Sequence, residues 1–244
     1  MRRGEGAIAP TAGARDSDRM LSRVVSRSKE VLYRLGLDDR ARIEVSQFVR
    51  GLAAELQRAP KQAPREAEYV HLGCGYERLP GFVNCDRMRN DAVDVVVDLR
   101  GSLPFASGSV KGIFHQHMLE HIDYPRGARH VLAESARVLR PGGLLRVGVP
   151  DLERYMEAYR AKDTTFAELV GVGRIDHAAE ILNFVFGHMH RFIYDFDMLR
   201  AELERAGFRD VRRAEHRDSA DPMLNQDNPS PGRLAESLFV EARR

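Results

Sequence analysis

The chain has 244 residues, which suits one α/β domain with an extension, and its ordinary apolar content excludes global disorder. Its net charge of +2 is too small to indicate a nucleic-acid-binding protein, and no apolar run reaches the roughly 18–20 residues of a membrane span. Two cysteines and the lack of an apolar segment after Met1 predict a cytoplasmic protein without a disulfide framework.

The N-terminal third predicts an appendage to the main domain. Residues 1–16 are rich in Gly, Ala and Arg and predict a flexible tail, whereas residues 17–65 show helical periodicity and end in a Pro-containing linker. Basic residues outnumber acidic ones in this arm, so it either contacts an acidic partner or membrane surface, or is a solvated helical face.

The remaining residues, 66–244, predict a single domain in which strands and helices alternate. We expect strands at 69–72, 82–85, 92–99, 110–115, 144–149, 211–214 and 238–241, a helix at 126–139, and a largely helical insert at about 152–206. The β-branched run at 92–99 is typical of a strand buried on both faces. This alternation predicts a doubly wound, mostly parallel, seven-stranded sheet with helices on both sides.

A two-glycine loop follows the first predicted strand, in the run HLGCG at 71–75. Glycines there let a ligand approach bare backbone at the carboxyl edge of the sheet. A dinucleotide-binding loop would carry a third glycine where this chain has Arg78, and its acidic residue about 20 positions further on. We therefore expect Gly73, Cys74 and Gly75 to hold a ligand with a ribose but no diphosphate, which disfavours a nicotinamide-dependent oxidoreductase.

Two carboxylates end neighbouring predicted strands at this same edge. Asp86 comes soon after the glycine loop, and a carboxylate there can accept hydrogen bonds from both hydroxyls of a ribose. Asp98 ends the next strand, where it can accept from an adenine amino group while Leu99 lies against the ring. The alternative is that both aspartates cap helices or form turns.

In the residues described so far, the chain resembles class I S-adenosylmethionine-dependent methyltransferases. More narrowly, it resembles small bacterial members of this class that are associated with polysaccharide or surface-sugar modification. The resemblance covers residues 68–151 well, and it rests on the glycine loop, Asp86, Asp98 and the runs LPGFVNCD at 79–86, LPF at 103–105, HMLEH at 117–121, RVLRPGGL at 137–144 and HMHRFIYD at 188–195. It implies a Rossmann-like fold and S-adenosylmethionine as the cofactor. His71 stands where the family has an acid that helps to fix the methionine end of the cofactor, so we expect His71 to contact the cofactor in a different way.

Methyl transfer to an alcohol requires in-line alignment of the acceptor and a base that takes its proton. The resemblance places the end of the 110–115 strand near the cofactor's methyl group, so we expect His115 to contact the cofactor and His117 to be the base. His190 is the second candidate base. The spacing of His115, His117 and His121, together with His188 and His190, is also compatible with metal ligation, but we expect no metal because the resembled family carries the run without one.

The insert predicts a wall over the mouth of the active site. Its run at 183–195 changes from apolar to polar and aromatic, which makes His188, Arg191 and Tyr194 candidates for substrate binding; the alternative is a structural network within the insert. Asp195 is expected to cap the next helix. Asp151 either faces the acceptor as a catalytic group or caps the helix that follows it.

The predicted function is O-methylation of a saccharide or another small hydroxylated acceptor. An N- or C-methyltransferase and a non-catalytic S-adenosylmethionine-binding module remain as alternatives. The core domain carries no basic stripe that would indicate a nucleic-acid substrate, and the sequence leaves a homodimer open.

Overall fold

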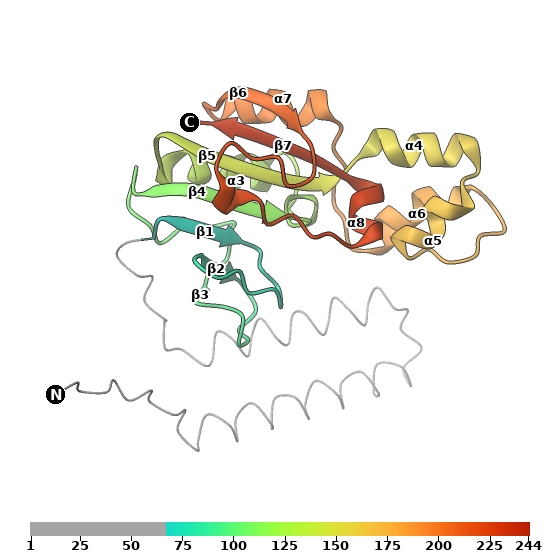
Figure 1. Ribbon diagram of the computed structural model, residues 1–244, viewed down its shortest axis with the longest axis horizontal. Coiled ribbons are helices and arrows are strands. Elements are labelled where there is room, and N and C mark those ends of the chain that lie inside the picture. Colours follow the sequence, from blue (N-terminus) through green and yellow to red (C-terminus); the bar gives the residue numbers. More distant parts are fainter. Residues whose placement is uncertain (1–66) are drawn as a thin grey trace, which may run out of the picture. The chain divides into compact units, whose positions relative to one another are not determined.

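The computed structural model describes residues 67–244, so the predicted tail and helical arm lie outside the described residues. A seven-stranded sheet with the order β3-β2-β1-β4-β5-β7-β6 forms the centre of this region (Figure 1). Its strands are β1 (Tyr69–Leu72), β2 (Val83–Asp86), β3 (Val95–Val96), β4 (Val110–Gln116), β5 (Leu139–Pro150), β6 (Arg209–Ala214) and β7 (Ser237–Arg243). The first five are parallel and β7 is antiparallel to both neighbours, which confirms the predicted Rossmann-like, mostly parallel fold.

Two predicted elements differ from the observed ones. The expected strand at 92–99 is wrong in length and burial, because β3 pairs over only two residues at the sheet edge and Val96 is exposed. An edge strand has a neighbour on one side only, and the chain turns away where Gly101 N donates to Asp98 O at 2.9 Å. The strand expected at 144–149 begins earlier, because β5 already starts at Leu139 and includes residues 141–143.

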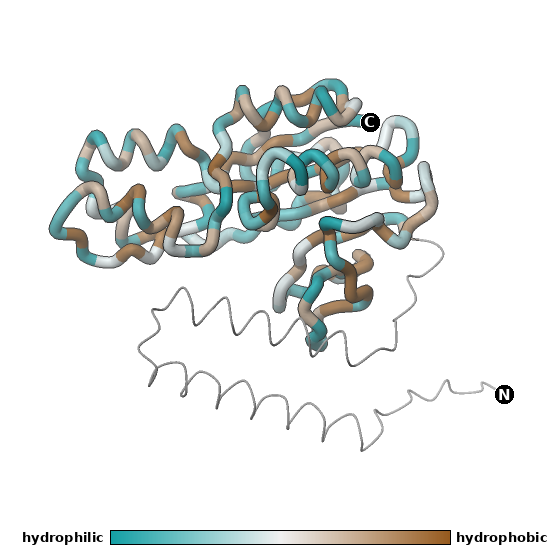
Figure 2. Tube along the Cα trace, turned by 180° about the vertical axis from the view of Figure 1, so that it is seen from behind, coloured by the Kyte–Doolittle hydropathy of each residue, from teal (hydrophilic) through white to brown (hydrophobic). Residues whose placement is uncertain are grey.

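The helices at 126–138 and 196–205 cover one face of the sheet and form the main core with it. The helices are α3 (Arg126–Val138), α4 (Leu152–Ala161), α5 (Thr164–Val170), α6 (Ala179–Gly187), α7 (Phe196–Arg205) and α8 (Pro231–Glu236), with 3-10 turns η1 (Leu119–His121) and η2 (Pro222–Leu224). Residues of α3 and α7 pack against alternate strand residues such as Leu72, Ile113 and Val147. Figure 2 shows this arrangement as hydrophobic residues along the strands and hydrophilic residues on the outer turns of the helices.

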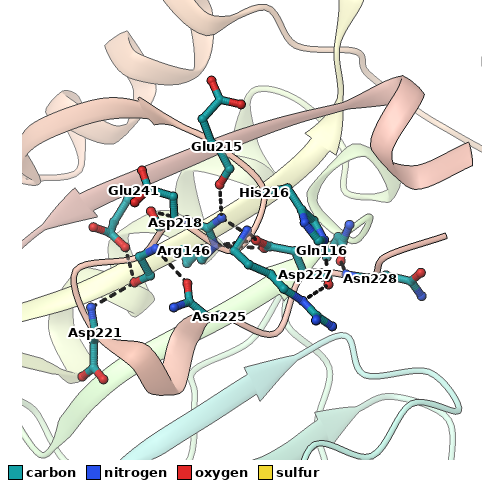
Figure 3. A network of polar contacts seen from close by, with 12 residues as sticks. Gln116, Arg146, Glu215, His216, Asp218, Asp221, Asn225, Asp227, Asn228 and Glu241 are labelled. Atoms are coloured by element: carbon teal, nitrogen blue, oxygen red, sulfur yellow. Dashed lines mark hydrogen bonds and ion pairs between the residues drawn. The ribbon is translucent and has the colours of Figure 1, made fainter. Parts of the chain in front are cut away.

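The opposite face carries a smaller core and a long pinned loop. Tyr69, Phe114 and Leu144 of the sheet pack there with Leu224 of η2. The loop between β6 and α8 is fixed by the fully buried Arg146, whose Nε donates to Asp227 Oδ1 at 2.8 Å (Figure 3). Because the loop is fixed in this way, the position of α8, which follows it, is fixed beside the sheet as well.

Helices α4, α5, α6 and α8 lie at the carboxyl ends of the parallel strands (Figure 1). Helices α4, α5 and α6 share a separate apolar core with residues such as Tyr155, Phe166 and Ile181, and α8 packs against α5. Asp195 caps α7 by accepting from Met198 N at 2.8 Å, as predicted. None of the helices within residues 67–244 is long and apolar enough to cross a membrane.

Candidate active site

The glycine loop is fastened to the end of β2. Both Gly73 N and Cys74 N donate to Cys85 O, and Gly75 N donates to Asp86 Oδ2 at 2.9 Å. Gly73 and Gly75 have φ values of +68° and +55°, which glycine adopts without strain. The structure thus brings Asp86 and the loop together, as the sequence indicated.

The loop also packs against the turn that follows β4. A Cβ atom added to Gly73 would lie 2.2 Å from Cγ of Met118, so only glycine leaves room for that side chain. A Cβ added to Gly75 would meet no described atom within 4 Å. No described atom therefore blocks a ligand that approaches the backbone at Gly75. The backbone at Gly73, in contrast, packs against Met118 in the turn after β4.

Asp86 retains hydrogen-bonding capacity beyond its contacts with the chain. Its Oδ2 accepts from Gly75 N, and its Oδ1 accepts from Met88 N at 2.8 Å. Because each carboxylate oxygen can accept two hydrogen bonds, one remains on each oxygen for ribose hydroxyls. Open backbone beside an under-used carboxylate fits an adenosyl ligand without a diphosphate.

Among the described residues, the side chains of Asp98 and Leu99 make contacts away from the glycine loop. The carboxylate of Asp98 is half exposed and accepts from Arg100 Nε at 2.9 Å; this hydrogen bond lowers the pKa of Asp98 below its usual value. Leu99 is buried in the main core. Their proposed contacts with adenine stay predictions.

His71 lies in β1, and its side chain is buried against Asn84 of β2. Its Nδ1 lies 3.2 Å from Oδ1 of Asn84, and burial lowers the pKa of His71 to about 4, so the ring is neutral at pH 7. Asn84 also binds Leu79 through both backbone groups, at 3.0 Å and 3.2 Å, and thereby shapes the loop that follows the glycines. In the sequence, the run at 79–86 serves only as a family marker, and no pattern in it indicates this organising role of Asn84.

A cavity of about 700 Å³ opens at the carboxyl end of β4. Four of the predicted histidines line it, namely His117, His121, His188 and His190. Its other walls come from the ends of α5 and α6 and from α8, which contributes Arg233 and Glu236. These two residues were missed because α8 is remote from β4 in sequence and reaches it only through the pinned loop.

His117 lies at the base of this cavity with both ring nitrogens in use. Its Nδ1 accepts from an Arg233 amino group at 2.5 Å, and its Nε2 lies 2.8 Å from Ser237 Oγ. Its φ of +50° is unusual for a residue with a side chain, and it marks the sharp turn at the end of β4. Burial, followed by the charge of Arg233, lowers the pKa of His117 to about 3, so the ring is neutral.

Glu120 is fully buried beneath the same wall. Its Oε1 lies 3.3 Å from Nδ1 of His117 and 4.0 Å from Nε2 of both His121 and His190. Neither carboxylate oxygen has a hydrogen-bond partner in the described part of the chain. Burial raises the pKa of Glu120 to about 7.

Backbone hydrogen bonds of the two residues after His190 hold His190 close to Glu120. Arg191 N and Phe192 N donate to Glu120 O at 2.7 Å and 3.3 Å, which holds the segment after α6 against η1. Met189 adopts φ of +60° immediately before His190. Burial, with contributions from the neighbouring histidines, lowers the pKa of His190 to about 3.

His188 lines the same cavity, whereas Asp151, Arg191 and Tyr194 are not among its lining residues. His188 lines the cavity with an exposed ring whose Nδ1 lies 3.0 Å from Phe184 O. Asp151 caps α4 by accepting from Glu153 N at 3.0 Å. The side chain of Arg191 is exposed, and that of Tyr194 is buried in the main core. Roles of Asp151, Arg191 and Tyr194 in catalysis or substrate binding stay predictions.

His115 is a fully buried histidine in β4, paired in register with Val147. Neither of its ring nitrogens has a hydrogen-bond partner among residues 67–244. Burial lowers the pKa of His115 to about 3, so it is neutral under ordinary conditions. Its expected contact with the cofactor also stays a prediction.

The region that contains the glycine loop is similar to a known protein family. Residues 61–147 match the protein family described as "Methyltransferase domain". No curated protein matches the chain. The matched region spans less than half of the chain and includes the glycine loop, Asp86 and the turn after β4.

Several solved structures resemble the chain at low sequence identity. One is a methyltransferase from Thermotoga maritima described as a possible histamine N-methyltransferase, with 17% identity, a TM-score of 0.45, and coverage of 80% of this chain and 88% of that one. Another is phosphoethanolamine N-methyltransferase 2 from Haemonchus contortus, with 14% identity, a TM-score of 0.45, and coverage of 80% and 52%. A third is a possible exported protein from Bordetella parapertussis, with 15% identity, a TM-score of 0.44, and coverage of 98% and 99%.

Proposed function

We propose that the protein transfers the methyl group of S-adenosylmethionine to a hydroxyl group of a saccharide or another small acceptor, which binds in the cavity beside α8. The observation that carries this proposal is the position of the cavity. His117 lines it, while the next residue, Met118, packs against Gly73 of the glycine loop. One short turn therefore connects the loop that would hold the cofactor with the pocket that would hold the acceptor.

The cofactor would lie against the open backbone at Gly75, with its ribose hydroxyls on Asp86. When bound, S-adenosylmethionine supplies an electrophilic methyl group on a positively charged sulfur. The chain's task is to align the acceptor oxygen with that group and to exclude water. The short helices α4, α5, α6 and α8 supply the cover at this end of the sheet.

An attacking alcohol must lose its proton, and the cavity wall holds groups that can promote this loss. His190 and His121 line the cavity, and Glu120 lies behind both of them. His117 is less suited to this task because Arg233 and Ser237 occupy its ring nitrogens. We therefore assign the activation of the acceptor to the wall formed by Glu120, His121 and His190, and the shaping of the pocket to His117.

The part of the cavity lined by α8 and α6 suits an acceptor with several hydroxyl groups. Arg233 and Glu236 of α8 form an ion pair at 2.7 Å in this wall, the side chain of Arg233 is 40% exposed and can donate to a ligand, and Phe184 of α6 adds an aromatic surface. Binding sites usually combine a largely apolar lining with a few placed polar groups, and a sugar offers both kinds of surface. This combination supports a saccharide more than a purely apolar substrate.

The test is incubation of the full chain with S-adenosylmethionine carrying a labelled methyl group and a cell extract, followed by identification of the labelled product. We expect the label on an oxygen atom of a small hydroxylated molecule. His190→Ala should lower turnover by about 100-fold or more and leave the affinity for S-adenosylmethionine unchanged in calorimetry. The exposed His177, which lies outside the cavity, provides a matched control, and His177→Ala should keep full turnover.

Three results would overturn the proposal. Label on nitrogen or carbon would reassign the enzyme to an N- or C-methyltransferase. Cofactor binding without any labelled product would favour a non-catalytic binding module. Binding of a nicotinamide dinucleotide with no affinity for S-adenosylmethionine would contradict the assignment of the glycine loop.

A further inference from the structure

We propose that Glu120, His121 and His190 together bind one divalent transition-metal ion in the wall of the cavity. These residues form the Glu-His-His cluster. The sequence included His121 and His190 among the histidines with spacing compatible with metal ligation, although we expected no metal there. It did not include Glu120, because the approach of Glu120 to His190 depends on the fold.

The ligand atoms of the cluster already lie close together. One atom from each residue can be chosen so that all three are within 4.8 Å of one another, and Glu120 Oε1 is 4.0 Å from Nε2 of each histidine. Metal bonds of about 2.1 Å require ligand atoms about 3.0–3.5 Å apart. The ligand atoms would therefore approach one another by between about 0.5 and 1.8 Å to close the cluster around an ion.

The buried carboxylate of Glu120 gives an independent indication of a ligand. Its side chain has 0% exposure, and neither oxygen has a hydrogen-bond partner within residues 67–244. The imidazole nitrogen that lies 3.3 Å from Oε1, Nδ1 of His117, already accepts from Arg233. An unpaired carboxylate in such a place is unfavourable, and a bound cation would compensate for its lost hydration.

The backbone holds the cluster in place before any ion binds. Glu120 and His121 are neighbours in η1, and Glu120 O accepts from Arg191 N at 2.7 Å, which fixes His190 opposite them. The left-handed conformation of Met189 turns the chain into this position. Unusual backbone conformations of this kind concentrate at functional sites, where the surrounding structure maintains them.

The donor set selects the class of metal. Two imidazoles and one carboxylate suit first-row transition ions such as Zn²⁺, Fe²⁺ or Co²⁺, whereas Mg²⁺ and Ca²⁺ prefer oxygen ligands throughout. Three protein ligands leave coordination positions open, and both histidines of the cluster line the cavity. An acceptor oxygen could take one of these positions; this role rests on the proposed function, whereas metal binding itself does not.

The experiment measures binding of Co²⁺ alone to the untagged full-length chain after treatment with a chelator. We expect one Co²⁺ per chain, seen as visible absorption bands, and displacement of Co²⁺ by Zn²⁺. His121→Ala and His190→Ala should each weaken the affinity at least tenfold, and Glu120→Gln should do the same because the amide lacks the charge. His177→Ala should bind as the wild-type chain does, and circular dichroism checks that each variant is folded.

Wild-type protein without these bands, or cluster variants with wild-type affinity, would overturn the metal site. His121 is partly exposed, so His121→Ala keeps the test decisive even if Glu120→Gln fails to fold. Cofactor and acceptor are absent from the binding measurement, so its failure leaves the methyl-transfer test unaffected. Full turnover by the chelator-treated enzyme would overturn the role of the ion in the reaction while supporting the proposed methyl transfer.

Discussion

Replacement of Asp227 by Asn should destabilise the protein more than any other single change in the loop between β6 and α8. The carboxylate faces Arg146, and both side chains have 0% exposure. Arg146 Nε donates to both carboxylate oxygens, at 2.8 Å and 3.1 Å, and Arg217 N donates to Oδ2 at 2.6 Å (Figure 3). Asp227→Asn has nearly the same volume, so its main effect is to leave a buried guanidinium without a counter-charge.

The expected cost follows from that burial. Breaking a buried ion pair by removing one partner typically costs about 3–5 kcal/mol, whereas an exposed pair contributes about 1 kcal/mol or less. Arg146 keeps its hydrogen bond to Glu215 O at 2.7 Å, so we expect a value near the lower end of that range, about 3 kcal/mol. Asp218→Asn is the matched control. Asp218 lies in the same loop and pairs with Arg212 of β6, but its side chain is 60% exposed.

Urea unfolding followed by circular dichroism measures both free energies of unfolding. A loss in Asp227→Asn as small as that in Asp218→Asn would refute the reasoning. The double variant Arg146→Met/Asp227→Leu adds a second check, since removal of both charges should recover most of the loss. No recovery would show that the loop depends on hydrogen bonds of the individual groups and not on the charge pair.

Three further predictions concern the glycine loop and its neighbours. Asp86→Ala should weaken S-adenosylmethionine binding by about 1–3 kcal/mol in calorimetry, and unchanged affinity would remove Asp86 as the ribose ligand. Gly73→Ala should reduce both stability and cofactor affinity, because alanine costs about 1–2 kcal/mol at a positive φ and its Cβ would meet Met118; wild-type behaviour would contradict the close packing. The pKa of His71 is about 4 in the folded chain against 6.5 ordinarily, so stability is retained above pH 6.5 and falls as the pH drops toward 4, by about 2–3 kcal/mol at pH 4.5. Urea unfolding at pH 7 and 4.5 should therefore show a smaller acid loss in His71→Gln than in the wild-type chain, and equal losses would exclude His71 as a cause.

The sequence by itself determined the parts of the molecule that depend on local pattern. Alternating strands and helices predicted the sheet, and the cap at Asp195 followed from its place before a helical run, whereas for Asp151 the cap was one of two alternatives. The pairing of the glycine loop with Asp86 was also predictable, because parallel strands bring their carboxyl ends to one edge of a sheet. These features need no knowledge of how distant segments meet.

The tertiary structure alone decided which residues share the cavity. A buried ion pair directs the β6–α8 loop and thereby places Arg233 against His117, more than a hundred residues earlier in the chain. A backbone hydrogen bond from Arg191 to Glu120 sets His190 beside Glu120. Backbone groups are the same in every residue, so no side-chain pattern could reveal this register, and Glu120 could be recognised as an unpaired buried carboxylate only once the segments around it were in place.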